Sequence, residues 1–173
     1  HDGELARQAR ARGFAVTVLG ARHRYDPGLA ARLAVTLRAA GVNVVHAHGY
    51  KATIACALAR GRAGTAVVKT EHGRLEPAGG DPVAWLKSRL NAGLDNAATR
   101  RAVAIVCYVT DDMRRHCARA HRGLRRVTVP NGVDPRDRDA LPRPPELEPG
   151  LLHLGLVGRL THVKGVPTAL RAL

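Results

Sequence analysis

Polar residues gather directly after several short apolar segments of this sequence. They are His46, His48 and Gly49; Thr70, Glu71, His72 and Gly73; Thr110 and Asp111; and Pro130, Asn131 and Gly132. In open parallel α/β sheets, ligands bind beyond the carboxyl ends of the strands. The sequence therefore predicts that most of its unusual polar groups lie along one edge of a sheet, where a ligand would bind.

His46 and His48 are two residues apart, so in an extended segment they project from the same face and could contact one ligand. For each of them alone, a hydrogen-bonded structural role remains an alternative. A metal site that adds Glu71 and His72 is conceivable, but these residues lack a local ligand spacing such as H-E-x-x-H. We therefore expect no metal and no cofactor.

The other strand ends also have simpler interpretations. Asp111 and Asp112 suit the first turn of a helix, where negative charge is favourable. Asn131 and Gly132 suit a turn, because both residues tolerate positive φ. These alternatives stay open.

A second group of polar residues is cationic. Gly158 and Arg159 are followed by Lys164 and Gly165, after an apolar run and before a helical pattern. Two cations in a glycine-containing loop at a helix N-terminus would suit a diphosphate. The spacing is neither a P-loop nor G-x-G-x-x-G, and a solvated basic loop is the simpler reading of these residues alone.

Helical and extended patterns alternate along the chain that would position these groups. Helical patterns cover residues 4–12, 29–40, 51–60, 82–101, a segment opened by Thr110 and Asp111, and 166–173; apolar runs that predict strands cover 14–19, 44–48, 65–70, 103–109, 126–129 and 151–157. This alternation predicts βαβ crossovers and hence an α/β fold, a Rossmann-like parallel sheet with helices on both faces.

A proline-rich segment interrupts the alternation. Residues 134–150 contain five prolines mixed with charged residues, which predicts a linker, and residues 151–173 form a single βα unit beyond it. Residues 1–133 are predicted to be the first domain. Because the chain begins at His1 and ends at Leu173 within a helical pattern, we expect a fragment.

The composition allows anionic partners but weakens one class of them. Among 173 residues, 28 Lys and Arg stand against 14 Asp and Glu, giving a formal charge of +14, whereas aromatic residues make up 3%. So few aromatic side chains disfavour a nucleic-acid module that stacks bases. A GC-biased gene alone would also produce such an arginine excess. The basic stretch from Arg114 to Arg126 could instead place one helix face on an acidic membrane.

The three cysteines, Cys56, Cys107 and Cys117, have no spacing typical of a disulfide framework or a zinc site, which favours a reducing compartment. No apolar run reaches the length of about 18 residues that spans a bilayer. We expect a cytoplasmic protein, with peripheral contact at the inner face of the membrane as an open alternative.

Six segments in this order resemble the retaining glycosyltransferases of the GT-B fold, family 4. They are residues 5–19, 45–52, 70–73, 106–110, 129–134 and 157–165. P-N-G-V-D and G-R-L-x-x-x-K-G, which flank the proline-rich segment, are the most specific of them. The resemblance runs nearly end to end.

The resemblance implies a role for each group of residues. Residues 1–133 would be the acceptor-binding domain, with His72 near the reacting sugar carbon and His46, His48, Gly49, Thr110 and Asn131 binding the acceptor. Arg159 and Lys164 would bind the donor diphosphate in the nucleotide-sugar domain that starts at residue 151. The reaction would move a sugar from a UDP- or GDP-linked donor to a sugar, lipid-linked or small-molecule acceptor, with retention of configuration.

The resemblance also shows departures. Residues 1–4 leave no room for the family's first strand and glycine-rich loop, and its paired glutamates would follow Leu173, so we expect residues 1–173 alone to be inactive. A role in cell-surface polysaccharide or glycolipid synthesis would fit the family. The alternatives are a related GT-B enzyme, such as a nucleotide-sugar epimerase or a phosphorylase, or a basic module that binds membranes or nucleic acid; we expect no nucleic-acid partner.

Overall fold

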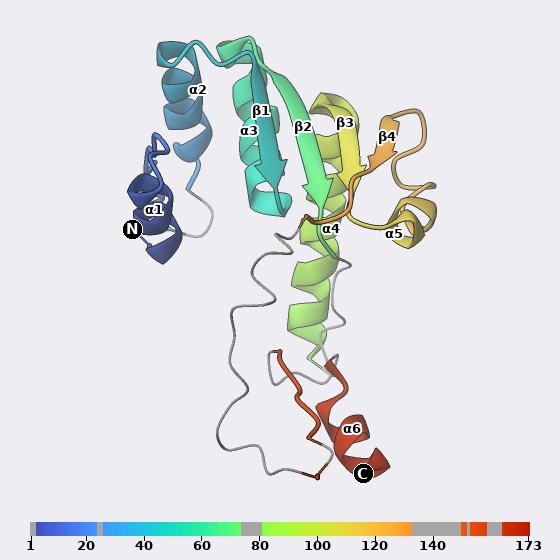
Figure 1. The fold of residues 1–173 in the computed structure, drawn as a ribbon. Coiled ribbons are helices and arrows are strands. Elements are labelled where there is room, and N and C mark those ends of the chain that lie inside the picture. Colours follow the sequence, from blue (N-terminus) through green and yellow to red (C-terminus); the bar gives the residue numbers. More distant parts are fainter. Residues whose placement is uncertain (1–2, 24–25, 74–80, 133–149, 152, 159–163) are drawn as a thin grey trace.

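A parallel sheet of four strands forms the centre of the computed structural model, which describes residues 3–23, 26–73, 81–132, 150–151, 153–158 and 164–173. The strands are β1 (Val44–His48), β2 (Ala66–Glu71), β3 (Val103–Tyr108) and β4 (Arg125–Thr128), hydrogen-bonded in the order β1-β2-β3-β4 (Figure 1). All four strands run in the same direction. Their carboxyl ends therefore meet at one edge, as the sequence predicts.

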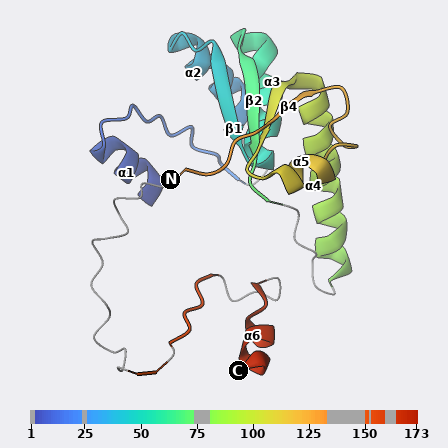
Figure 2. The same ribbon diagram turned by 45° about the vertical axis from the view of Figure 1, so that its right-hand side comes forward.

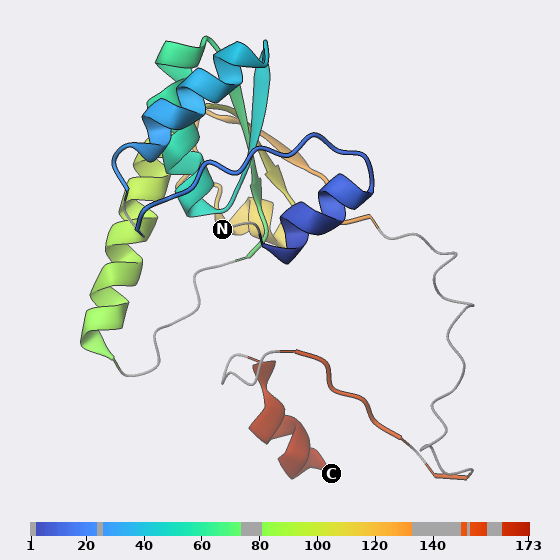
Figure 3. The same ribbon diagram turned by 90° about the vertical axis from the view of Figure 1, so that its left-hand side faces the viewer.

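The helices are α1 (Glu4–Ala11), α2 (Leu29–Ala39), α3 (Tyr50–Ala63), α4 (Pro82–Ala102), α5 (Asp111–His116) and α6 (Val166–Ala172). Figure 3 shows α2, α3 and α4 on one side of the sheet and α1 on the other, although no residue of α1 is buried. The predicted α/β fold, a Rossmann-like parallel sheet with helices on both faces, is confirmed.

Local chemistry explains where the helices around the sheet begin and end. The side chain of Asp81 accepts a hydrogen bond from the Val83 amide at 2.9 Å, and Pro82 occupies the first turn of α4, where a missing amide hydrogen costs nothing. The Thr110 hydroxyl caps α5 through the amide of Met113 at 3.2 Å. Gly64 ends α3 with φ of 68°, in the left-handed region that favours glycine.

The core lies between the sheet and helices α3 and α4. Ala47, Val67, Val106 and Tyr108 of the strands are buried with Cys56 and Met113. One irregularity occurs in this sheet: Val67 pairs with Val103, but Val68 pairs with Ile105, so Ala104 is an extra residue in β3. Beyond this bulge, Tyr108 is level with Glu71 on β2.

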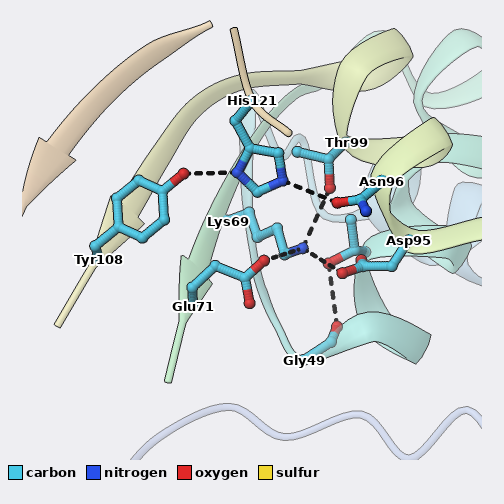
Figure 4. A network of polar contacts seen from close by, with 9 residues as sticks. Gly49, Lys69, Glu71, Asp95, Asn96, Thr99, Tyr108 and His121 are labelled. Atoms are coloured by element: carbon cyan, nitrogen blue, oxygen red, sulfur yellow. Dashed lines mark hydrogen bonds and ion pairs between the residues drawn. The ribbon is translucent and has the colours of Figure 1, made fainter. Parts of the chain in front are cut away.

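A lysine lies fully buried among these apolar residues. The ammonium group of Lys69 is 2.6 Å from carboxylate oxygens of both Asp95 and Glu71, and it donates to the Thr99 hydroxyl at 3.2 Å (Figure 4). Asp95 and Thr99 belong to α4, whereas Lys69 and Glu71 belong to β2. A buried charge is tolerated only when it is paired and hydrogen-bonded, and here that pairing joins α4 to the sheet.

Two predicted strands do not form. Residues 14–19 have no strand partner; instead, the Arg32 guanidinium donates hydrogen bonds to the carbonyl groups of Leu19 at 3.0 Å and Gly20 at 3.1 Å, and Phe14 remains 66% exposed. In the second segment, residues 153–157 are irregular, and Leu154, Leu156 and Val157 are exposed. Apolar β-branched residues favour a strand, but a strand also needs a neighbour to satisfy its backbone groups.

The predicted basic helix within residues 114–126 is also wrong. Helix α5 ends at His116, turns cover residues 117–123, and Arg125 and Arg126 belong to β4. The arginines of this stretch therefore do not form one helical face. The proposed linker, residues 134–150, falls almost entirely outside the described residues.

Replacing Lys69 by Met should destabilise the fold strongly. The substitution leaves the largely buried carboxylates of Asp95 and Glu71 without their cation, for which a cost of about 3 kcal/mol is expected in the free energy of unfolding. Chemical denaturation measures this loss. Lys51→Met, at an exposed position of α3, is the matched control and should change the free energy by less than about 0.5 kcal/mol; equal stability of the two variants would contradict the role of Lys69.

Candidate active site

Three of the predicted histidines meet where β1 and β2 end. His46 Nε2 lies 2.7 Å from Thr70 Oγ1, and His48 Nδ1 lies 2.7 Å from His72 Nε2. The ring centroids of His46 and His48 are 4.4 Å apart, and those of His48 and His72 are 5.0 Å apart. The parallel register, which places His46 beside Val68 and His48 beside Thr70, brings the rings together on one face.

This clustering affects the charge of the central ring. Burial, which removes solvent from the ring, lowers the pKa of His48 below its ordinary value. The electrostatic effects of the neighbouring His46 and His72 lower this pKa further. His48 is therefore neutral near pH 7. A neutral ring can share one proton with His72 across the 2.7 Å contact, which two imidazolium rings could not do.

A pocket of about 510 Å³ adjoins His72 at the same edge of the sheet. It lies between the end of β2, the start of α3, and helices α4 and α5. Its lining includes Gly49, Glu71, His72, Asp95, Asn96 and His121. Gly49 turns the chain from β1 into α3 with φ of 81°, a conformation that a side chain would strain.

The lining carries carboxylates in an otherwise basic chain. Glu71 and Asp95 are both held by Lys69, which is buried beneath them. The second oxygen of Asp95, Oδ1, is buried and has no hydrogen-bond partner within the described part of the chain. The side chains of Glu71 and Asp95 nevertheless remain 19% and 14% exposed, and their accessible oxygens can accept hydrogen bonds from the hydroxyl groups of a polar ligand.

A buried hydrogen-bond chain supports the far side of the pocket (Figure 4). The Tyr108 hydroxyl lies 2.6 Å from His121 Nδ1, and His121 Nε2 lies 3.2 Å from the carbonyl oxygen Oδ1 of Asn96. Because this oxygen can only accept, His121 carries its proton on Nε2 and accepts at Nδ1 from Tyr108. Burial, and then the charge of Lys69, lowers the pKa of His121 to about 4, and burial raises the pKa of Tyr108.

Sequence reasoning missed these supporting residues. Tyr108 lies in an apolar run, and His121 lies in a basic stretch that suggests a solvated surface. Lys69 and Asp95 are 26 residues apart. The alternation of β2 could have signalled a charged residue at an inward position, but only the fold shows its partner.

The structure gives Thr110 and Asn131 less distinctive positions. The Thr110 hydroxyl is engaged as the cap of α5, and Asn131 is exposed in an irregular segment after β4. Neither residue lines the pocket beside His72. Their predicted part in acceptor binding stays a prediction.

The predicted diphosphate site is described only in part. Arg159 lies outside the described residues. Lys164 precedes α6, and its side chain lies against Gly158. Figures 1 and 2 both show α6 apart from the sheet, so the structure does not bring Lys164 to the histidines.

The described part of the chain shows neither a metal-binding group nor a membrane span. Its His, Cys, Asp and Glu side chains form no group of three or more that could hold a metal ion. None of its helices has both the length and the apolar character that crossing a bilayer requires.

The parallel sheet with helices on both faces makes this a Rossmann-like α/β protein, with histidines and a pocket at the carboxyl edge of the sheet. Comparison with known proteins gives its family. The model of Glycosyltransferase Family 4 matches residues 18–137, more than half of the chain, and the chain belongs to this family. No curated protein matches it.

A solved structure has a similar fold. The crystal structure of Anabaena Alr3699/HepE, in complex with UDP and glucose, matches with a TM-score of 0.60 and 20% sequence identity. The match covers 78% of this chain and 35% of that chain, so the chain spans about a third of the HepE length. At this identity the match supports the fold alone.

The stability of the protein should depend on pH through His121. Its folded-state pKa of about 4 lies below the unfolded value of about 6.5, so the unfolded chain binds more protons between these values. The contribution is fully present above about pH 6.5, and about 2 kcal/mol of the free energy of unfolding should be lost between pH 7 and pH 5. Denaturation at both pH values measures this loss.

His121→Gln is the control for this measurement, because glutamine keeps a hydrogen-bonding side chain but does not titrate. The difference between pH 7 and pH 5 should be about 2 kcal/mol smaller in this variant than in the wild type. The same pH dependence in both proteins would show that His121 is not held neutral by its surroundings.

Proposed function

We propose that the protein transfers a sugar from a nucleotide-sugar donor, UDP- or GDP-linked, to an acceptor hydroxyl, with retention of the anomeric configuration. The observation that carries this proposal is the cluster of His46, His48 and His72 beside a pocket at the carboxyl edge of the sheet, in a chain that belongs to Glycosyltransferase Family 4. HepE, which has a similar fold, was crystallised with UDP and glucose, and this supports the donor class.

In the proposed reaction, the bond between the anomeric carbon and the diphosphate oxygen breaks and a bond from the acceptor oxygen forms. Negative charge grows on the departing diphosphate, and the acceptor hydroxyl passes its proton to the diphosphate oxygen that is released. His72 is the residue proposed nearest to the reacting carbon. His46, His48 and Gly49 are proposed to bind the acceptor, together with Thr110 and Asn131.

The cations Arg159 and Lys164 are proposed to neutralise the departing diphosphate. Preorganised positive charge is effective where charge develops in the transition state. Helix α6 lies apart from the sheet, so the proposal requires the segment that carries Lys164 to approach the carboxyl edge. The proposed donor site is therefore assembled rather than preformed.

An acceptor in polysaccharide or glycolipid synthesis, and action at the inner face of a membrane, fit the family and are part of the proposal. An epimerase or a phosphorylase of the same fold remains the alternative. The product distinguishes the three activities. A new glycoside formed from a nucleotide sugar supports a transferase, and an altered nucleotide sugar formed without an acceptor supports an epimerase. A sugar phosphate formed with inorganic phosphate supports a phosphorylase.

A thermal-shift panel with the full-length protein should identify the donor. The nucleotide that binds the folded state raises the melting temperature, and a ligand at 100 times its Kd contributes about 2.7 kcal/mol. We expect UDP or GDP to give the largest shift, ahead of ADP, CMP and inorganic diphosphate. Equal shifts for all of them would indicate general anion binding by a basic protein.

Substitution of His72 by Ala in the full-length enzyme should lower kcat/KM about 100-fold or more, if its ring interacts with the reacting groups. Lys164→Ala should raise the KM for the donor or strongly lower kcat. His23→Ala, which is not part of the pocket lining, is the matched control and should leave both constants unchanged. Unaltered kinetics for His72→Ala would remove that residue from the reaction, and the same result for Lys164→Ala would remove it from the donor site.

A further inference from the structure

Helix α4 exposes a row of large apolar side chains to solvent. Val83 is 58% exposed, Leu86 53%, Leu90 59% and Leu94 58%. The spacing of three, four and four residues places them in one stripe along the helix. This stripe, Val83, Leu86, Leu90 and Leu94, is called the α4 leucine face below.

The opposite side of α4 packs against the rest of the protein, and its residues are polar or small. Ser88, Ala92 and Asp95 are half-buried and Thr99 is fully buried. Asp95 and Thr99 bind Lys69 there. An ordinary surface helix places its apolar residues inward, so the amphipathic pattern of α4 is reversed. The α4 leucine face therefore does not serve the core of the described structure.

Cations lie beside this face, and a tryptophan is exposed on another side of the same helix. Lys87, Arg89 and Arg101 are exposed on α4, and Trp85 is 51% exposed with the Arg89 guanidinium 5.1 Å from its ring centroid. Asp95 is the one acidic residue between Pro82 and Ala102, and it is bound to Lys69. A leucine face bordered by basic side chains is typical of helices that lie in the surface of a membrane.

The shape of the molecule makes this helix accessible. Figures 1 and 2 show the amino-terminal half of α4 extending beyond the edge of the sheet. Val83, Trp85, Leu86 and Leu90 lie on that half. A flat surface could therefore meet them without contacting the body of the sheet.

The charge of the protein distinguishes between two candidate partners of the α4 leucine face, a second copy of the chain and an anionic membrane. A second copy of the chain would place exposed cations against exposed cations, in a protein of formal charge +14. An anionic bilayer accepts the leucines among its acyl chains and neutralises the cations with its headgroups. We propose that the α4 leucine face docks the protein on an anionic membrane surface. This inference does not depend on sugar transfer, and its test uses no nucleotide sugar.

Co-sedimentation of the full-length protein with vesicles tests the proposal. Vesicles of phosphatidylcholine with phosphatidylglycerol should bind the protein, and vesicles of phosphatidylcholine alone should bind it much more weakly. The double variant Leu86→Glu with Leu90→Glu should weaken binding to the anionic vesicles at least tenfold or so. Leu58→Glu is the matched control, since Leu58 of α3 is 63% exposed and lies outside this face, and it should bind like the wild type.

The contribution of charge is tested separately. Lys87→Gln and Arg89→Gln should each weaken binding to the anionic vesicles, by about fivefold per cation, and added salt should have the same effect. Circular dichroism of each variant verifies that α4 still forms. Equal binding to neutral and anionic vesicles would overturn the proposed preference for anionic lipid.

Other outcomes would contradict the proposal that the α4 leucine face docks on a membrane. They are absence of vesicle binding by the wild type, equal binding by the Leu86→Glu, Leu90→Glu variant, and equal loss in Leu58→Glu. If the wild type instead forms a dimer that the double variant dissociates, with no binding to vesicles, a second copy covers the face. Binding to vesicles together with failure of every transfer assay would support the docking surface and count against the proposed function alone.

Discussion

The buried charge of Lys69 is the constraint on which the rest of the described structure depends. An ammonium group in a protein core is stable only where carboxylates surround it, and here they come from β2 itself and from α4. The pairing fixes α4 against the sheet with its polar side inward. That orientation lines the pocket with Glu71 and Asp95, and it leaves the leucines of the same helix in solvent.

Helix α4 thus serves two surfaces at once. Its inner side contributes Asp95 and Asn96 to the pocket beside His72, and its outer side is the α4 leucine face. If that face rests on a membrane, the pocket is held at a fixed height above the lipid surface. An acceptor carried on a lipid would then approach the histidines from a defined direction, which an acceptor free in solution would not.

Much of the fold and part of the site follow from the sequence. Short Val- and Ile-rich runs between helical patterns predict the four strands that form, and the parallel arrangement brings His46, His48 and His72 to one edge. The run at 14–19 has the same composition but forms no strand, because pairing depends on a neighbour that composition does not reveal. The partners of Lys69 and His121 could not be predicted either, since they lie on other elements, and the orientation of α4 depends on them.

The extra residue in β3 has an effect larger than its size suggests. Side chains alternate from face to face along a strand, so Ala104, which has no counterpart on β2, exchanges the two faces for every residue that follows it. Tyr108 consequently emerges on the side of the sheet that holds Lys69 and His121. If Ala104 were instead paired as an ordinary strand residue, alternation from Val103 would direct the phenol to the opposite face and leave His121 buried without its donor. The extra residue Ala104 thus determines which face of the sheet each later residue of β3 occupies.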